Sequence, residues 1–184
     1  RISEAMAVKY SHTVVADNSA IAEYIKENYN LECETIAYGG DHAVKASEAN
    51  ENLWISCTAK DYALAICRIE PENNVEMILE AFSSLHLDLV FIGNWQASEY
   101  GKRLLSGYCG FKNLHLLDSI YDNNILFRYR KNCCAYIHGH SAGGTNPSLV
   151  EMMHFGKPII AHDCAYNRAS MEDHGNYFSN PRQL

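Results

Sequence analysis

The chain has 184 residues, 47% of them hydrophobic and 20% charged, which is typical of one globular domain with a short additional segment. Its 15 Lys and Arg against 22 Asp and Glu give a net charge of −7 without a long basic tract, so we expect no nucleic-acid partner. No apolar run approaches the roughly 18 residues that a membrane-spanning helix needs.

The first 42 residues predict a unit of their own. We expect a strand over residues 13–16, a helix over 19–28 and a strand over 33–37, followed by Gly39 and Gly40. Polar residues 45–60 separate this unit from the rest. The predicted domains are therefore residues 1–42, the end of a preceding domain with a crossover, and residues 43–184. Because the first residue is Arg1 and not Met, we expect a piece of a longer protein, truncated at its C-terminus as well.

From Tyr62 onward, short apolar runs alternate with amphipathic stretches. Nearly continuous apolar strands between helices indicate a parallel sheet that is covered on both faces. The predicted fold is therefore α/β, a doubly wound, Rossmann-like parallel sheet. Its strands are expected at residues 63–69, 87–93, 113–117, 133–137 and 157–161, and its helices at residues 73–85, 98–107, 124–131 and 147–155.

The cysteine pattern indicates a reducing environment. There are seven cysteines, an odd number, and no pair has the Cys-x-x-Cys spacing. This favours buried thiols over a disulfide framework or a zinc site. We expect a cytoplasmic protein, and contact with the inner face of the membrane stays open.

The segment CCAYIHGHSAGGTNP, residues 133–147, predicts an anion site. A buried strand leads into a glycine-containing loop, and Asn146 is positioned to cap a helix that begins at Pro147 and stops at Gly156. Free backbone amides at a helix N-terminus bind phosphate or diphosphate. The loop lacks the Walker sequence and the Gly-x-Gly-x-x-Gly spacing. A simple tight turn at Gly143 and Gly144 is the alternative.

Two charged residues extend this prediction. Glu151 lies about one turn inside the helix, and helical side chains lean toward the N-terminus, so its carboxylate can reach the hydroxyls of a bound ribose or sugar. A solvated surface glutamate is the alternative. Arg68 lies at the carboxyl end of the strand expected over residues 63–69, at the edge where α/β sheets bind ligands, so it contacts either Glu70 or Glu72 or a phosphate. We favour phosphate.

His138 and His140 flank Gly139 and suggest a metal site with Asp163. A metal site usually needs a third well-placed ligand, and the sequence does not place Asp163 or another residue in that position. We therefore favour histidines in the core or in contact with a ligand, and we expect no metal.

Three segments resemble the retaining glycosyltransferases of family 4: ICRIEPENNVEMILEAF at residues 66–82, GGTNPSLVEMMHFGKPIIAHD at 143–163, and IAYGGD at 36–41. These are GT-B enzymes with two Rossmann-like domains facing across a cleft. The chain is most similar to a branch described as rhamnosyltransferases of bacterial polysaccharide synthesis. The resemblance implies that residues from about 43 onward form most of the nucleotide-sugar domain.

The resemblance also implies roles for individual residues. Arg68 would bind the donor diphosphate and Glu151 the ribose hydroxyls, and these are the expected catalytic residues. Ile120 would touch the base through its backbone. The backbone amides of Gly143, Gly144 and Thr145 would bind the donor phosphates and sugar. Apart from the resemblance, we also expect Gly93, His140, Asn146 and Ser148 to bind the donor. Two positions depart from the family pattern: Gly143 stands where a glutamate contacts the sugar, and Asn73 where a lysine contacts the diphosphate.

The resulting hypothesis is a retaining glycosyltransferase without a metal cofactor. Its substrates would be a nucleotide-diphospho-sugar, with dTDP-rhamnose as one candidate, and a growing or lipid-linked glycan. The chain alone would bind nucleotide weakly and transfer nothing. A nucleotide-sugar 2-epimerase of the same architecture and a non-catalytic nucleotide-binding module are the alternatives.

Overall fold

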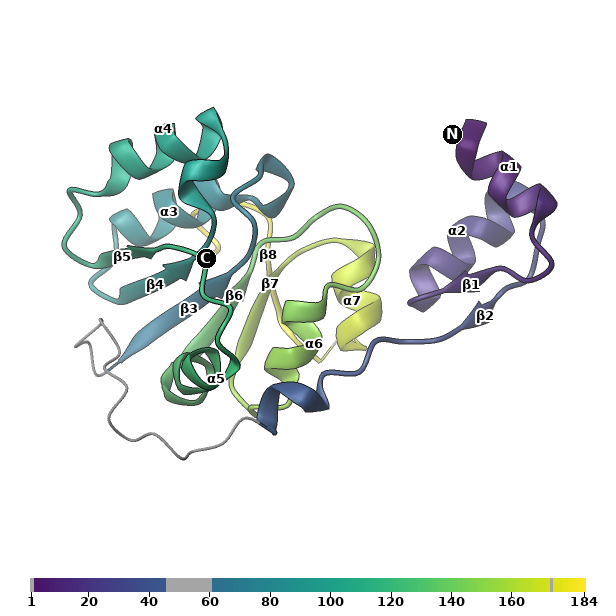
Figure 1. Ribbon diagram of the computed structural model, residues 1–184. Helices are drawn as coiled ribbons and strands as arrows, with labels where there is room; N and C mark the ends of the chain where they lie inside the picture. The colour runs from purple at the N-terminus through teal and green to yellow at the C-terminus, as the bar shows by residue number, and fades with distance from the viewer. Residues whose placement is uncertain (1, 46–60, 173) are drawn as a thin grey trace.

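A six-stranded parallel sheet forms the centre of the computed structural model, which describes residues 2–45, 61–172 and 174–184 (Figure 1). The strand order is β5-β4-β3-β6-β7-β8. Because the chain starts this sheet at β3 and continues outward first in one direction and then in the other, the order reverses between β3 and β6. Ligands of such sheets bind at this reversal, at the carboxyl ends of the strands. The strands are β3 (Tyr62–Ile66), β4 (Asp88–Ile92), β5 (Leu114–Leu117), β6 (Ala135–His138), β7 (Ile159–His162) and β8 (Asn176–Phe178).

Helices cover both faces of the sheet, which confirms the predicted doubly wound fold. Alternating residues of β3 point to opposite faces, as the pleat of a strand requires. Ala63 and Ala65 belong to the core under α3 (Val75–Ser83) and α4 (Glu99–Tyr108). Tyr62 and Leu64 belong to the second core. That core packs against α5 (Asn123–Asn132), α6 (Pro147–Met153) and α7 (Ala165–Met171).

The N-terminal unit lies beside this domain. It consists of α1 (Ile2–Tyr10), β1 (Val15–Ala16), α2 (Ser19–Tyr29) and β2 (Glu34–Thr35), and its two short strands pair in parallel. Figure 1 shows the unit next to α7, with which α2 is in contact. The chain then passes into a 3₁₀ helix, η1 (Asp41–Val44), which packs against α6. The predicted polar segment covers residues 45–60, of which residues 46–60 lie outside the described residues.

The structure corrects several predicted elements. Helix α1, helix α7 and strand β8 were not predicted. The helix expected over residues 73–85 starts later, because residues 71–73 form a 3₁₀ turn, η2 (Pro71–Asn73), and Asn74 has a left-handed conformation with φ 49°. The strand expected over residues 133–137 begins at Ala135, since Cys133 still caps α5. Within the described residues, no helix is both long and apolar enough to cross a membrane.

Candidate functional site

A pocket of about 250 Å³ lies at the carboxyl ends of β3, β4 and β5. It brings together three residues that the sequence predicted, namely Arg68, Gly93 and Ile120. The Arg68 side chain is exposed, and among the described residues no hydrogen bond or ion pair engages its guanidinium, so it does not pair with Glu70 or Glu72. The pocket is lined by Ile66, Cys67, Arg68, Ile92, Gly93, Asn94, Ser119, Ile120 and Tyr121.

The backbone around Arg68 is held by two asparagines. The Asn73 side-chain amide donates a hydrogen bond of 2.7 Å to the Arg68 carbonyl. The Ile69 amide donates to Oδ1 of Asn94 at 2.6 Å. The turn after β3 is therefore fixed while the arginine side chain extends from it. Asn94 was not predicted, because its role depends on the pairing of β4 with β3 and not on a local pattern.

His140 is linked to the same turn through Asn73. Nδ1 of His140 lies 2.8 Å from Oδ1 of Asn73. Because the Asn73 amide nitrogen donates to the Arg68 carbonyl, its oxygen is the acceptor and Nδ1 of His140 carries the hydrogen. Burial lowers the pKa of His140, and the positive charge of Arg68 acts in the same direction, whereas a hydrogen bond with the Ala142 backbone and the charge of Glu72 raise it. His140 is therefore joined to the turn that carries Arg68 through the Asn73 side chain.

The start of the glycine-containing loop is tied to the turn at η2. The Asn74 side chain donates to the Gly139 carbonyl at 2.8 Å, and Ser141 donates from both its amide and its hydroxyl to the Glu72 carbonyl. Further along the loop, Gly143 is exposed. The loop therefore leaves the sheet beside the turn that carries Arg68.

The end of this loop contacts the N-terminal unit. The Thr145 amide donates a hydrogen bond of 2.8 Å to a carboxylate oxygen of Asp17, and Asn18 donates to the Thr145 hydroxyl at 3.1 Å. Gly144 lies so close to Asp17 that a Cβ atom there would overlap the carboxylate. The Asp17 carboxylate thus accepts a hydrogen bond from one of the amides that were predicted to bind phosphate. A phosphate would have to displace this carboxylate to bind the Thr145 amide. Asp17 and Asn18 were not predicted, because more than 120 residues separate them from Thr145.

The helix after the loop begins as predicted. The Asn146 side chain accepts a hydrogen bond from the Ser148 amide at 3.0 Å, and Pro147 occupies the first helical position. Gly156 has a φ of 60°, a conformation that stops a helix after its last turn. The Ser148 amide and the Asn146 side chain are therefore used in capping.

Glu151 is neither a solvated residue nor a free one, since its side chain is 16% exposed and both carboxylate oxygens have partners. Nη2 of Arg130, from α5, contacts one oxygen. Nε2 of His42, from η1, lies 2.9 Å from the other. Neither partner was predicted, since α5 and η1 are brought to α6 only by the tertiary fold.

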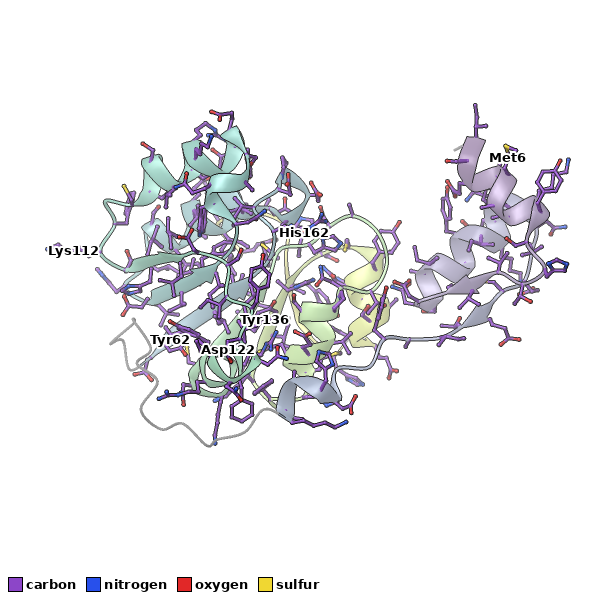
Figure 2. All side chains as sticks on the ribbon, in the orientation of Figure 1. Met6, Tyr62, Lys112, Asp122, Tyr136 and His162 are labelled. Atoms are coloured by element: carbon purple, nitrogen blue, oxygen red, sulfur yellow. The ribbon has the colours of Figure 1, made fainter. Side chains whose placement is uncertain are left out.

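Tyr136 lies beside the end of β3, two residues before Arg68. It lies in the interior of the sheet domain (Figure 2), where its hydroxyl donates to the Ile66 carbonyl at 3.3 Å, just before Arg68. Burial is the main cause of its raised pKa, to which the nearby charge of Glu151 contributes. Arg68 follows β3 and Glu151 lies in α6, the helix after β6, so the two residues follow the two strands between which the order reverses.

The predicted histidines differ in environment. His138 is buried and stacks on Tyr136, and burial lowers its pKa to about 3, so it is a neutral core residue. Asp163 forms an ion pair with Arg168. Within the parts of the chain that the structure describes, there is no group of three or more His, Cys, Asp or Glu that could hold a metal ion.

Solved structures share this fold. The Anabaena protein HepE, solved in complex with UDP and glucose, is similar to this chain with a TM-score of 0.75 and 15% identity, over 100% of this chain and 53% of HepE. Sucrose-phosphate synthase from Thermosynechococcus elongatus gives 0.73 and 15%, over 100% of this chain and 49% of its own. TarM of S. aureus gives 0.71 and 14%, over 97% and 36%. The chain thus spans about half or less of the length of these proteins.

No curated protein matches the sequence. A family model does match, over residues 54–182, and it is described as "Glycosyl transferases group 1". The matched residues include the pocket, the glycine-containing loop and α6, and they account for more than half of the chain. The chain therefore belongs to the glycosyl transferases of group 1.

Proposed function

We propose that this chain is the donor-binding part of a retaining glycosyltransferase that uses a nucleotide-diphospho-sugar. The observation that carries the proposal is the exposed Arg68 side chain, without an ion-pair partner among the described residues, at the pocket formed by the carboxyl ends of β3, β4 and β5. A guanidinium there is suited to bind a diphosphate with several charge-assisted hydrogen bonds. Family membership and a neighbour solved with UDP support this choice of ligand.

The proposed chemistry is stabilisation of a leaving group. When the bond between the anomeric carbon and the diphosphate oxygen breaks, the electron pair stays on that oxygen. A fixed positive group beside the diphosphate stabilises this charge as it develops. Arg68 would supply that group, with His140 and the amides of Gly143 and Gly144 nearby, while Ile120 would face the base and Glu151 the pentose.

The proposal extends to the identity of the donor sugar and of the acceptor. We propose dTDP-rhamnose as the donor and a growing or lipid-linked surface glycan as the acceptor, in the cytoplasm at the inner face of the membrane, without a metal cofactor. The resemblance of residues 143–163 to rhamnosyltransferases supports this choice.

Calorimetric titration of the chain with UDP, GDP and dTDP, alone and as sugar conjugates, tests the proposal. One nucleotide should bind selectively. Arg68→Ala should weaken its binding by about 1.5–3 kcal/mol, the usual contribution of a charged hydrogen bond, with little change in unfolding temperature. Lys112→Ala is the matched control, since it removes the same charge at the amino end of β5. Equal losses in the two variants, or no nucleotide binding at all, would refute the proposal.

A further inference from the structure

A buried ion pair joins α5 to α6. Arg130 is only 4% exposed, and its guanidinium contacts the carboxylate of Glu151. A buried arginine needs a paired carboxylate, because an uncompensated charge in the interior is strongly destabilising. Glu151 is the carboxylate that the structure provides for it among the described residues.

Packing alone does not account for this pair. The two helices already meet in an apolar core that contains Leu126 and Tyr129 of α5 and Leu149 and Met152 of α6. Replacing a buried ion pair by apolar side chains is often neutral or stabilising. Moreover, Nε of Arg130 is buried without a hydrogen-bond partner in the described part of the chain. An arrangement selected for stability alone would not leave this donor unsatisfied.

The pair instead determines how the Glu151 carboxylate is presented. Arg130 holds one oxygen from the buried side, and His42 holds the other from the exposed side. An ionised carboxylate has about four directions in which it accepts hydrogen bonds, so each oxygen keeps a free direction. At 16% side-chain exposure, the carboxylate is still reachable from solvent. Arg130 and His42 thus orient the Glu151 carboxylate, and each of its oxygens can still accept a further hydrogen bond.

We infer that Arg130, assisted by His42, positions the Glu151 carboxylate to accept a hydrogen bond from the 3′-hydroxyl of the donor's pentose. Arg130 is a positioning residue, since it acts through Glu151. The inference rests on the proposed function and adds to it a residue in α5, which no motif of the sequence marks.

The test compares two ligands that differ in one hydroxyl: dTDP and its 3′-deoxy analogue, titrated calorimetrically into the chain. The unmodified chain should prefer dTDP by about tenfold or more, the usual effect of one hydrogen bond to a charged group. Arg130→Met should reduce this preference to less than about threefold while changing the affinity for the analogue little. Arg130→Lys, which keeps the charge but loses the planar geometry, should retain part of the preference.

Two further variants keep the test decisive. His42→Gln lies on the exposed side of the carboxylate, so it should fold even where Arg130→Met does not, and it should reduce the preference by a smaller factor. Lys131→Met, the neighbouring residue on α5, is the control and should leave the preference intact. A preference that persists in the folded Arg130 and His42 variants overturns the inference alone. Absence of nucleotide binding by the unmodified chain overturns the proposed function, and the inference with it.

Discussion

His138 is a residue whose burial makes the stability of the protein depend on pH. Its ring is 2% exposed and its pKa is lowered to about 3, against an ordinary value of about 6.5. The unfolded chain therefore binds a proton between these values that the folded chain does not, and stability is lost as the pH falls below about 6.5. Between pH 7 and pH 5 the expected loss is about 2 kcal/mol.

Urea denaturation at both pH values checks this expectation, with His138→Leu as the comparison. The variant cannot bind the proton, while the carboxylates and the other histidines titrate in both proteins. The loss on acidification should therefore be smaller in the variant by about 2 kcal/mol. The same loss in both proteins would show that His138 is not the cause.

Single residues also show what the sequence could and could not predict. Arg68 and Glu151 were predictable, because each stands at a recognisable place relative to a strand end or a helix start. The partners of Glu151 were not, since Arg130 is one of several charged residues on α5 and His42 lies 109 positions away in the chain. The same holds for Asp17 at Thr145. Such contacts depend on how the elements pack, and periodicity carries no information about that.

At the scale of elements, the start of α6 is the part that the sequence predicted best. Asn146 caps the helix and Pro147 follows it, as expected. Asn146→Ala should therefore destabilise the protein by about 1 kcal/mol, the usual cost of losing an N-cap. Chemical denaturation measures this, and Asn146→Asp, which keeps a capping oxygen, should restore most of the stability. An unchanged free energy of unfolding in Asn146→Ala would mean that the cap contributes nothing to stability.

The elements that escaped prediction share a physical reason. Helix α7 and strand β8 are short, at 7 and 3 residues, so neither offers enough turns or alternations to establish a period. Helix α1 has no buried residue among its nine, so no apolar stripe marks it. By contrast, β3 and β4 are central strands with almost continuously buried residues, and both were predicted, although the first was extended to residue 69, three residues past its end at Ile66.

At the scale of the whole molecule, Asp17 and Asn18 attach the N-terminal unit to the glycine-containing loop. Asp17→Ala removes the acceptor of the Thr145 amide, so β1 and α2 should exchange their amide hydrogens faster while the central sheet is unaffected. Hydrogen exchange read by mass spectrometry measures this. Glu23→Ala, which removes an exposed carboxylate from α2, is the control. Equal exchange in the two variants would show that Asp17 does not hold the unit in place.

The N-terminal segment contacts α6 and the loop that leads into it at two separate points. Asp17 holds the loop just before the helix, and His42 reaches Glu151, a residue within it. Two contacts restrict rotation of the N-terminal segment relative to the sheet domain, whereas a single contact would allow it. If the N-terminal segment moves relative to the sheet domain, the carboxylate of Glu151 gains or loses the His42 contact in the same movement, so the orientation of this carboxylate and the position of the segment are linked.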